Sequence, residues 1–581
     1  MREVRLWNDV DEFLSPSQQI LANRGIPLDR QEEWLQADEH NFHNWRLIDE
    51  KKMTEACKLL HQCVEDDGKI QIVVDCDADG YTASAILMNY FFMVHPQWAT
   101  CSHVSYIMHE GKEHGLRDVM GQIKDDTNIV FCPDGGSNDR ECHKILRDKG
   151  ITCIVLDHHP CDRDNNDAIV INTQLTKYPN KSLTGAGVVW KFCQAYDDLY
   201  VYDAANMFMD LCMLGNIGDM ADYRELEIRA IVNVGRRQDR NGWLQAMEVA
   251  NKYVIDKHGG ISYMGLAFGV VPFLNALVRV GSQEDKDLVF RAMLDYYAST
   301  ELITTAVKKL NTMKRLQMKI VNQSLEMIQK VIEEEDLTSH KLLLLALPAD
   351  VLDREVTGLV ANKLQSLYHM PTVVMTENSE DGIYYGSIRN YSKSSIADLR
   401  KDLEDTGKIE WCRGHGNAAG IAVFKDDVKD LLLTFDANHD LLEEQQVEYV
   451  DYCWEESIDR QDVHVISELG KLAPLYGQQV DEAKVAITDL RSDVCSVSLL
   501  SPDRNPTLKI APRNLDMAII KFKSSQEEYD RIKRDKPSLS LIGTCNLNEW
   551  NGKVTPQVLV DDFEIRESKN ADSEEEESPW W

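Results

Sequence analysis

The sequence predicts an α/β protein of several domains, of which the first large one is built on a parallel sheet. Its 581 residues correspond to about four domains of ordinary size, and 43% hydrophobic residues can fill several cores. Between residues 70 and 160, three apolar runs without polar alternation are separated by segments long enough for helices. Such runs are typical of parallel strands covered by helices on both faces.

Each of these three strands ends in acidic side chains. One acid at such a position could simply cap the following helix, because Asp is a favoured N-cap residue. Three strands that end this way favour a binding site, because ligands of open α/β sheets bind beyond the carboxyl ends of the strands. The side chains are Asp75, Asp77 and Asp79 in IQIVVDCDADG, Asp134 in NIVFCPDGG, and Asp157, His158 and His159 in ITCIVLDHH.

The chemistry of these side chains predicts a site for divalent cations. Carboxylate oxygens with one or two imidazoles suit Mn²⁺ or Mg²⁺, whereas thiolate sites suit zinc. Two such ions about 3.5–4 Å apart activate water and stabilise phosphoryl transfer. Asp219, in LCMLGNIGDMAD after a helical segment, could complete the set. We expect the neighbouring Cys76, Cys132 and Cys153 in the core.

Three further segments predict elements of the later domains. Residues 299–335 carry apolar side chains at three- and four-residue spacing without Gly or Pro, which predicts one long connecting helix. Residues 342–375 read as strand, helix and strand, the start of a second α/β domain. Near the C-terminus, LSLIG and PQVLVDDF predict two strands around an NEWNGK turn.

Composition limits the class of protein. No apolar stretch approaches the 18 residues of a membrane span and the polar start lacks a secretory signal, so we expect a cytoplasmic protein with no membrane partner. The fourteen cysteines contain no Cys-x-x-Cys pair, which indicates reduced thiols. The formal charge of −34 leaves room for a polyanionic substrate, because salt screens distant acids over about 8 Å.

Taken together, the DCDADG run, Asp134, the DHH triplet at 157–159 and Asp219 resemble the four motifs of the DHH phosphoesterase superfamily. The nearest match is the RecJ type. This resemblance implies a 5′→3′ exonuclease that hydrolyses single-stranded DNA to mononucleotides in replication, recombination or repair. It also implies two divalent cations, Mn²⁺ preferred or Mg²⁺.

The resemblance assigns roles to the motif residues. His159 would contact the scissile phosphate and Asp157 would orient the neighbouring imidazole, so that Asp157, His158 and His159 form the catalytic group. Asp75 could be a direct ligand or a residue behind the ligands. The implied metal ligands are Asp75, Asp77, Asp79, Asp134, His158 and Asp219.

Three segments outside the metal motifs are similar to substrate-binding segments of the RecJ type. PFLNALVRVG at 272–281 implies contacts from Asn275 and Arg279 with substrate phosphate. GSIRN at 386–390 implies that Ser387 and Arg389 bind the 5′-phosphate. GHGNAAG at 414–420 resembles the signature of the DHH-associated domain and implies His415 as a contact across the cleft.

Two departures from the family pattern bear on phosphate binding. Arg413 stands where the family has a glycine. HEGKEHGL at 109–116 replaces Arg-x-x-Glu-Gly-Tyr-Gly-Leu, so His109 occupies the position of a phosphate-binding arginine. His109, Lys112 and His114 are all candidates to restore that contact, and the requirement for a terminal phosphate is open.

The end of the chain resembles the RecJ oligonucleotide-binding fold, which implies a C-terminal OB-like β-barrel. Trp550 could stack on a DNA base there or pack in the core. The resulting division of the chain is an N-terminal segment at 1–45, the DHH domain at 46–225, a helical region with the connecting helix at 226–335, the DHH-associated domain at 336–440, the OB-like domain at 441–568, and an acidic disordered tail at 569–581.

The tail, ADSEEEESPWW at its end, has three readings: a mimic of a nucleic-acid strand, a docking segment for a replication or single-strand-binding protein, or a solubilising extension. We expect a monomer.

Two other functions compete with the exonuclease. An oligonucleotide or cyclic-dinucleotide phosphodiesterase would not need the Arg279 segment or a C-terminal binding fold, and a non-catalytic replication scaffold would not need every ligand position filled. RNA stays open as a substrate.

Overall fold

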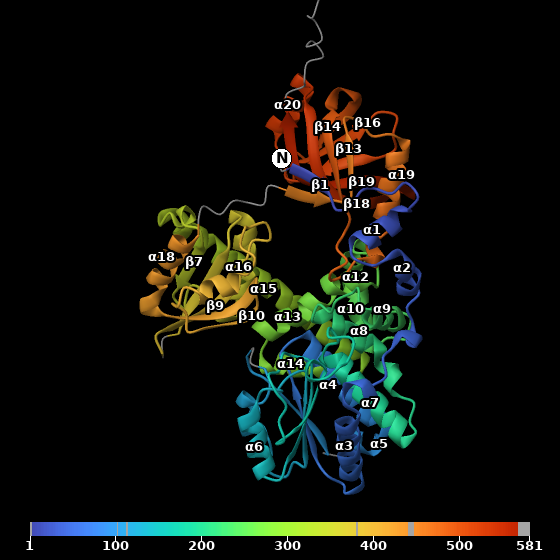
Figure 1. The fold of residues 1–581 in the computed structure, drawn as a ribbon, viewed down its shortest axis with the longest axis vertical. Coiled ribbons are helices and arrows are strands. Elements are labelled where there is room, and N and C mark those ends of the chain that lie inside the picture. The colour runs from blue at the N-terminus through green and yellow to red at the C-terminus, as the bar shows by residue number, and fades with distance from the viewer. Residues whose placement is uncertain (1–2, 101–102, 112–113, 379–380, 440–446, 567–581) are drawn as a thin grey trace, which may run out of the picture.

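The computed structural model describes residues 3–566, apart from 101–102, 112–113, 379–380 and 440–446. The predicted acidic tail lies outside the described residues. The described chain forms three lobes around a helical centre, with one large sheet in each lobe (Figure 1). The lower lobe holds the parallel sheet, the left-hand lobe a five-stranded mixed sheet and the upper lobe a seven-stranded mixed sheet.

The lower lobe confirms the predicted parallel sheet. Its five strands run in the order β3-β2-β4-β5-β6, and every neighbouring pair is parallel. The side chains of β2 and β4 are buried throughout, as expected for strands without polar alternation. The strands are β2 (Ile70–Val74), β3 (Val104–Met108), β4 (Ile129–Pro133), β5 (Thr152–Asp157) and β6 (Ile169–Asn172).

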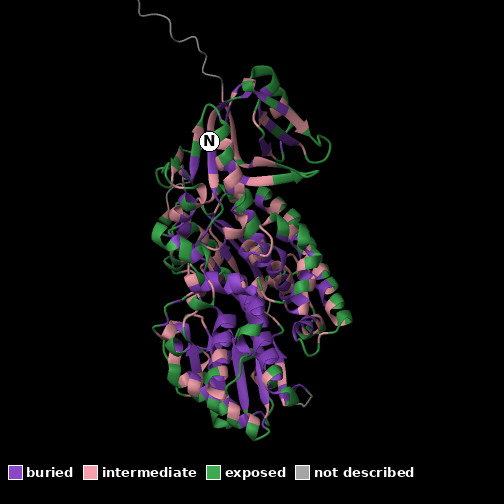
Figure 2. Ribbon diagram, turned by 90° about the vertical axis from the view of Figure 1, so that its right-hand side faces the viewer, coloured by how far each residue is buried: buried purple, intermediate pink, exposed green. Residues whose placement is uncertain are grey.

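Helices cover both faces of this sheet. One face packs on α3 (Arg46–Glu65), α4 (Ala78–Val94) and α7 (Gly185–Tyr200), and the other packs on α6 (Arg140–Asp148). The sheet and the helices against it are the most deeply buried part of the lobe (Figure 2). The DCDADG run therefore has little freedom, because it joins a fully buried strand to an almost fully buried helix.

The helical centre confirms the predicted connecting helix. It appears as α15 (Thr300–Glu334), 35 residues long, whose first turn is capped by the Ser299 side chain. Its apolar face is buried first against α13 (Val271–Val280) and α14 (Gln283–Met293), then against the left-hand lobe. The helix therefore links the two lobes by burying one continuous face in both.

One segment, Tyr263–Val280, is apolar and long enough to cross a membrane by length and composition. It forms two successive helices, α12 (Tyr263–Gly269) and α13, rather than one. More than half of it is buried, and its side chains belong to the core of the helical centre. This packing is typical of core helices.

The left-hand lobe confirms the predicted strand, helix and strand. They are β7 (Leu343–Leu347), α16 (Thr357–Tyr368) and β8 (Thr372–Asn378), and β7 pairs with β8 in parallel. The sheet continues through β9 (Ile383–Arg389) and β11 (Ala418–Phe424) to β10 (Trp411–His415) in antiparallel steps. The Ser387–Arg389 and Arg413–His415 segments therefore lie two strands apart in one sheet.

The upper lobe contains the predicted C-terminal hairpin. β18 (Ser538–Trp550) pairs with β19 (Lys553–Arg566), and the two-residue turn between them has positive φ at Asn551 and Gly552, as hairpin turns require. The sheet order is β13-β14-β18-β19-β17-β16-β15, so β13 (Tyr452–Glu455) and β15 (Cys495–Leu500) are its two edges among the described residues. The predicted OB-like β-barrel is therefore not confirmed.

The N-terminal segment binds the far end of the chain. β1 (Glu3–Leu6) pairs in parallel with β12 (Val447–Val450), and Arg24 forms a buried bidentate ion pair with Asp451. The segment then descends to the helical centre, where the Trp34 indole donates to the carbonyl of Tyr223. It therefore ties the upper lobe to the lobe that carries the parallel sheet.

Candidate metal centre and phosphate pocket

The acidic strand ends meet at the carboxyl edge of the parallel sheet, with His158 in the middle. The Nε2 atom of His158 lies 3.2 Å from Asp134 Oδ1, 3.4 Å from Asp219 Oδ2 and 3.9 Å from Asp79 Oδ2. These four side chains come from the first turn of α4, from the loops after β4 and β5, and from the end of α8 (Met209–Gly218). The fold thus brings together residues from all four predicted motifs.

Local backbone geometry explains how each acid reaches the site. Asp134 has φ of 61°, a left-handed conformation that turns its carboxyl group away from the line of β4. Asp77 caps α4 by accepting from the amide of Gly80. Asp79 accepts from the hydroxyl of Thr184 and from two amides at the start of α7, an end that favours negative charge.

Glycines make this convergence possible. A Cβ atom at Gly185 would lie 2.4 Å from Asp134 Oδ1, and a Cβ at Gly215 would lie 2.4 Å from Asp79 Oδ1. Real Cβ atoms do not approach oxygen so closely. The helices α7 and α8 can therefore pack directly on the two carboxylates only because they present glycine at these points.

The charges of the centre repel one another strongly. Burial and the charges of Asp79 and Asp77 raise the pKa of Asp134 well above its usual range, and they raise the pKa of Asp219 to about 7. Burial also lowers the pKa of His158, which favours the neutral imidazole that binds metals. The centre is therefore an acidic cluster that a cation would stabilise.

The buried atoms of the centre fit such a cation. Asp134 Oδ1, His158 Nε2 and Asp75 Oδ2 are buried and make no hydrogen bond among the described residues; the first two face each other at 3.2 Å. Buried polar atoms are rarely left without a partner, and an unseen ion is one explanation. Oxygen and imidazole donors suit Mn²⁺ or Mg²⁺. The residues present therefore fit divalent metal ions.

Asp157 orients the two histidines instead of joining the cluster. Its Oδ1 accepts from the amides of His158 and His159 and pairs with His159 Nδ1 at 2.8 Å, while its Oδ2 accepts from the amide of Ser137. Burial opposes a charge on His159, but the bond to Asp157 raises the pKa of His159 to about 9. Because Asp157 holds Nδ1, the Nε2 atom of the partly exposed His159 is left to contact a substrate.

Asp75 lies beside the centre in a different set of contacts. Its Oδ1 accepts from the amide of Cys76 and pairs with His114 Nδ1 at 2.9 Å. Its charge contributes to the raised pKa of Asp134, so the two carboxylates are near neighbours. Burial raises the pKa of the Cys76 thiol to about 11, which argues against a cysteine nucleophile.

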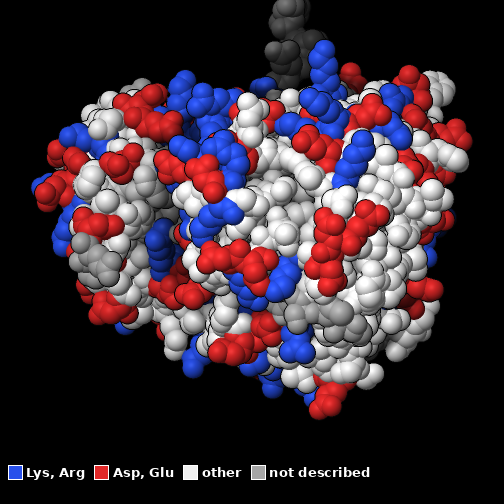
Figure 3. Space-filling model, turned by 90° about the horizontal axis from the view of Figure 1, so that it is seen from below, with Lys and Arg blue, Asp and Glu red and all other residues white. Residues whose placement is uncertain are grey.

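The predicted phosphate-binding residues meet in a separate cavity of about 310 Å³ between α13 and the left-hand lobe. Arg279, Ser387 and Arg389 line it, together with Arg413 and Glu355. Gly358 admits the Arg389 guanidinium, since a Cβ there would lie 2.9 Å from Nη2. Seen from below, lysine and arginine side chains gather along the hollow beside this lobe (Figure 3).

This pocket collects positive charge that an anion would neutralise. Burial and then the charge of Arg279 lower the pKa of Arg389. Burial and the same arginine lower the pKa of Lys314 on α15. Arg413 enters from β10, with its guanidinium 5.2 Å from the Trp411 ring. Three guanidinium groups around one cavity of this size are suited to a phosphate group.

Four of the other predicted residues lie outside this pocket. Asn275 lies one turn before Arg279 on α13, and His415 is exposed as the last residue of β10. His109 is only 2% exposed and does not line the cavity. Trp550 is 73% exposed at the tip of the β18–β19 hairpin. Lys112 lies outside the described residues.

A comparison over the whole length decides the family. The chain is 34% identical over 588 residues to the "Putative SPbeta prophage-derived single-strand DNA-specific exonuclease YorK" of Bacillus subtilis (strain 168), covering 98% of this chain and 99% of that protein. The model of the DHH family, N-terminal domain, matches residues 69–216. The chain belongs to the DHH family and is of the RecJ type.

Other RecJ proteins agree with this assignment. The RecJ of Bacillus subtilis (strain 168) is 24% identical over 536 residues, covering 89% of this chain and 64% of that protein. The crystal structure of RecJ from Thermus thermophilus in complex with Mn²⁺ superposes with a TM-score of 0.72 at 18% identity, covering 97% of this chain and 80% of that chain. Because the identity is only 18%, this superposition supports the fold of the chain and nothing beyond the fold.

Sequence reasoning missed three features of this RecJ-type protein. The sequence marks Arg413 only as a departure from the family, whereas the structure places it in the lining of the cavity with Arg279 and Arg389. Phe522 is 58% exposed and lines a cavity of about 380 Å³ on the C-terminal sheet with Lys509. Cys76 is buried as expected, but its partnership with His114 depends on β2 and β3 being neighbours. The unexpected residue types at 109–116 were the only signal for the last feature.

Proposed function

We propose that this RecJ-type protein is a cytoplasmic, metal-dependent exonuclease that hydrolyses single-stranded DNA from its 5′ end and releases mononucleotides. One observation carries the proposal: Arg279 lines the arginine pocket beside Glu355, and its helix α13 contacts both α4, which carries Asp79, and α8, which ends beside Asp219. Burial lowers the pKa of Arg279, and the charges of Glu355 and Asp77 oppose that shift. A terminal phosphate held by Arg279 would then place the following phosphodiester at the acidic centre.

Five residues would hold the two cations: Asp77, Asp79, Asp134, His158 and Asp219, with Asp75 alongside. Bound Mn²⁺ or Mg²⁺ would supply Lewis acidity and a water of lowered pKa. The chain itself keeps His158 neutral by burying its imidazole, which lowers its pKa, and the backbone amide of His158 donates a hydrogen bond to Asp157 Oδ1. It also holds the carboxylate of Asp79 against the start of α7, so that this ligand is positioned before any cation arrives.

His159 and the arginine pocket would handle the substrate. His159 carries a proton at neutral pH, because its pKa is about 9, and its Nδ1 is held by Asp157. Its Nε2 can therefore donate to an oxygen of the scissile phosphate as negative charge develops there. Arg279, Arg389 and Arg413 would grip the terminal phosphate, which fixes the position of cleavage one nucleotide along.

A long single strand is the substrate that best explains the rest of the chain. The cavity with Lys509 and Phe522 offers a cation and an aromatic face, the combination that binds single strands without sequence preference. The names of YorK and of the RecJ relatives specify single-strand DNA, in line with this choice. A non-catalytic scaffold is disfavoured, because every ligand position contains a ligating side chain.

The test uses matched single-stranded oligonucleotides labelled at either end, as DNA and RNA, with 5′-phosphate or 5′-hydroxyl. We expect 5′-labelled mononucleotide to appear first from DNA with Mn²⁺ or Mg²⁺ and no release with chelator. Asp134→Asn should be inactive, and the exposed acid Asp162, changed to Asn, serves as the control. Release of the 3′ label first would refute the polarity, and equal cleavage of RNA would refute the choice of DNA.

We also propose that the protein acts as a monomer and that the tail beyond residue 568 contacts a replication or single-strand-binding protein. Deletion of 569–581 should leave cleavage of naked DNA unchanged and weaken cleavage of DNA coated with single-strand-binding protein. Equal loss on both substrates would indicate that the tail serves the enzyme itself.

A further inference from the structure

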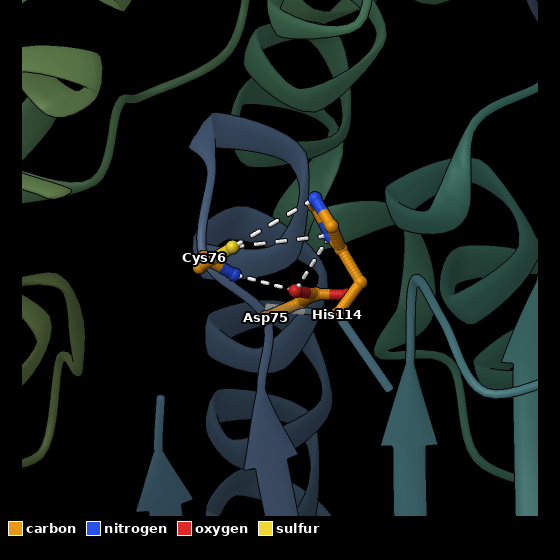
Figure 4. A group of neighbouring side chains, drawn as sticks. All are labelled: Asp75, Cys76 and His114. Atoms are coloured by element: carbon orange, nitrogen blue, oxygen red, sulfur yellow. Dashed lines mark hydrogen bonds and ion pairs between the residues drawn. The ribbon is translucent and has the colours of Figure 1, made fainter. Parts of the chain in front are cut away.

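A second group of metal-binding side chains lies beside the predicted centre, at the ends of β2 and β3. Asp75, Cys76 and His114 offer an oxygen, a sulfur and a nitrogen, and these atoms all lie within 4.8 Å of one another. Figure 4 shows the three side chains converging from two separate loops. Asp75 and Cys76 are buried, whereas the His114 side chain is 51% exposed, so the group is open on one side.

The separations are close to those of a tetrahedral cation site. Zinc bonds of about 2.3 Å to sulfur and 2.0–2.2 Å to nitrogen or oxygen would separate sulfur from nitrogen by about 3.5 Å and nitrogen from oxygen by about 3.4 Å. Cys76 Sγ lies 3.9 Å from His114 Nδ1, and this nitrogen lies 2.9 Å from Asp75 Oδ1. Adjustments of about half an ångström, which the exposed His114 can supply, would complete the geometry.

A second observation also points to a ligand at this place. The Oδ2 atom of Asp75 is buried without a hydrogen-bond partner among the described residues, and so are both ring nitrogens of His109. His109 is 2% exposed and lies against Asp75 and Cys76. A second buried imidazole therefore adjoins the group.

The group is chemically different from the predicted Mn²⁺ or Mg²⁺ centre. That centre consists of carboxylates and imidazole. Within it, donor atoms of Asp134, His158 and His159 lie within 4.8 Å of one another. Here a sulfur replaces one oxygen, which shifts the preference from hard cations to thiophilic ones. The two groups are neighbours, since the rings of His114 and His159 are 6.1 Å apart.

We propose that Asp75, Cys76 and His114 form a separate site for a thiophilic divalent cation, Zn²⁺ being the representative. Binding would release the thiol proton of Cys76 to solvent and leave a fourth position for water or for His109. A cation held there would draw on the carboxylate of Asp75 and add positive charge beside the Mn²⁺ ligands. Zn²⁺ would therefore weaken Mn²⁺ binding and inhibit; this consequence rests on the proposed nuclease function, whereas the site does not.

The test uses the reduced full-length chain with Mn²⁺ in excess and Co²⁺ as the probe. We expect one Co²⁺ per chain with the intense absorption of a thiolate–cobalt bond, displaced by Zn²⁺. Cys76→Ala and His114→Ala should both abolish this absorption. Cys161→Ala is the matched control, because Cys161 is a partly exposed thiol near the DHH turn whose sulfur contacts backbone carbonyls of Ser137 and Arg163.

Each outcome decides the proposal. Absorption that persists in Cys76→Ala, or that is absent from the unmodified chain, would overturn it. If circular dichroism shows that Cys76→Ala misfolds, the result with His114→Ala decides, because the His114 side chain is half-exposed and its loss should not disturb the fold. Inhibition by Zn²⁺ that is equal in the parent and both variants would place the inhibiting ion at the Mn²⁺ centre and refute the regulatory part. A chain with the cobalt signal but no nuclease activity would retain the site and lose the function.

Discussion

One carboxylate, that of Asp157, sets the direction of both histidines in the turn after β5. Asp157→Asn would keep the size of the side chain but remove the charge that holds His159 protonated and would place an amide donor next to two backbone amides. We expect activity to fall about 10–100-fold, the cost typical of losing a partner that orients a ligand. Rates with saturating Mn²⁺ test this, with Asp162→Asn as the control; an unchanged rate would contradict the orienting role.

Arg413 adds a third guanidinium to the cavity for which we propose phosphate binding. Arg413→Gly would remove this guanidinium at an exposed strand position and leave Arg279 and Arg389 in place. We expect the preference for 5′-phosphorylated over 5′-hydroxyl DNA to fall about tenfold or more, since a charge-assisted hydrogen bond contributes about 1.5–3 kcal/mol. KM for the two oligonucleotides measures this. Arg504→Gly, at an exposed arginine of the upper lobe, is the control.

At the scale of elements, α7 and α9 (Leu226–Gly235) are joined by an ion pair without solvent contact. Lys191 Nζ lies 2.9 Å from Glu227, and Glu227 also accepts from Tyr178 and Asn180. Glu227→Gln would leave the buried Lys191 without its counter-charge. We expect a loss of about 3–5 kcal/mol in the free energy of unfolding. Urea unfolding measures it, and Glu141→Gln on the exposed side of α6 should cost almost nothing.

The strand β12 carries an acid that makes stability depend on pH. Glu448 lies between Lys484 and Lys393; burial opposes its charge, but the hydrogen bonds to the two lysines lower its pKa from 4.5 to about 2. A lowered pKa in the folded state adds stability above pH 4.5 that is lost as the pH falls towards 2. The stability difference between the parent and Glu448→Gln should therefore be largest near pH 6 and shrink below pH 4.5. If this stability difference instead grew as the pH fell, the pKa of Glu448 would be raised by folding and the prediction would be wrong.

At the scale of the whole molecule, metal ions should act as ligands of the folded state. With Mn²⁺ at 100 times its Kd, one site adds about 2.7 kcal/mol to the free energy of unfolding, and relief of repulsion among the acids adds to the effect. Thermal unfolding should shift upward with Mn²⁺ in the parent chain and in Asp162→Asn, but much less in Asp134→Asn. An equal shift in all three would indicate binding away from the DHH centre.

The sequence predicted the parts of the molecule that depend on local pattern. The apolar runs ending at Asp75, Asp134 and Asp157 became adjacent parallel strands, and the Gly-free segment became α15. The sequence did not predict contacts that depend on which strands are neighbours in a sheet. Cys76 and His114 lie together because β2 pairs with β3, and the C-terminal sheet is open because its edge strands β13 and β15 are not paired with each other among the described residues.

The N-terminal strand is the clearest case of such a long-range contact. β1 has four residues that are exposed or half-buried, and its half-buried Val4 and Leu6 pack on a small apolar cluster of Val450, Ala486 and Ile542. The polar contacts of Arg24 and Asn23 with Asp451 add to this pairing of β1 with β12. These contacts join residues separated by 428 positions in the case of Asn23, which no local pattern can encode.

The pairing of β1 with β12 also fixes an order of events during synthesis. The first strand leaves the ribosome long before its partner exists, because the two are separated by most of the chain. The nascent chain can complete the lobe with the parallel sheet while β1 has no partner, and β1 can pair only after residues 447–450 have been made. Released fragments that stop short of residue 447 would carry an unpaired strand, a known route to aggregation.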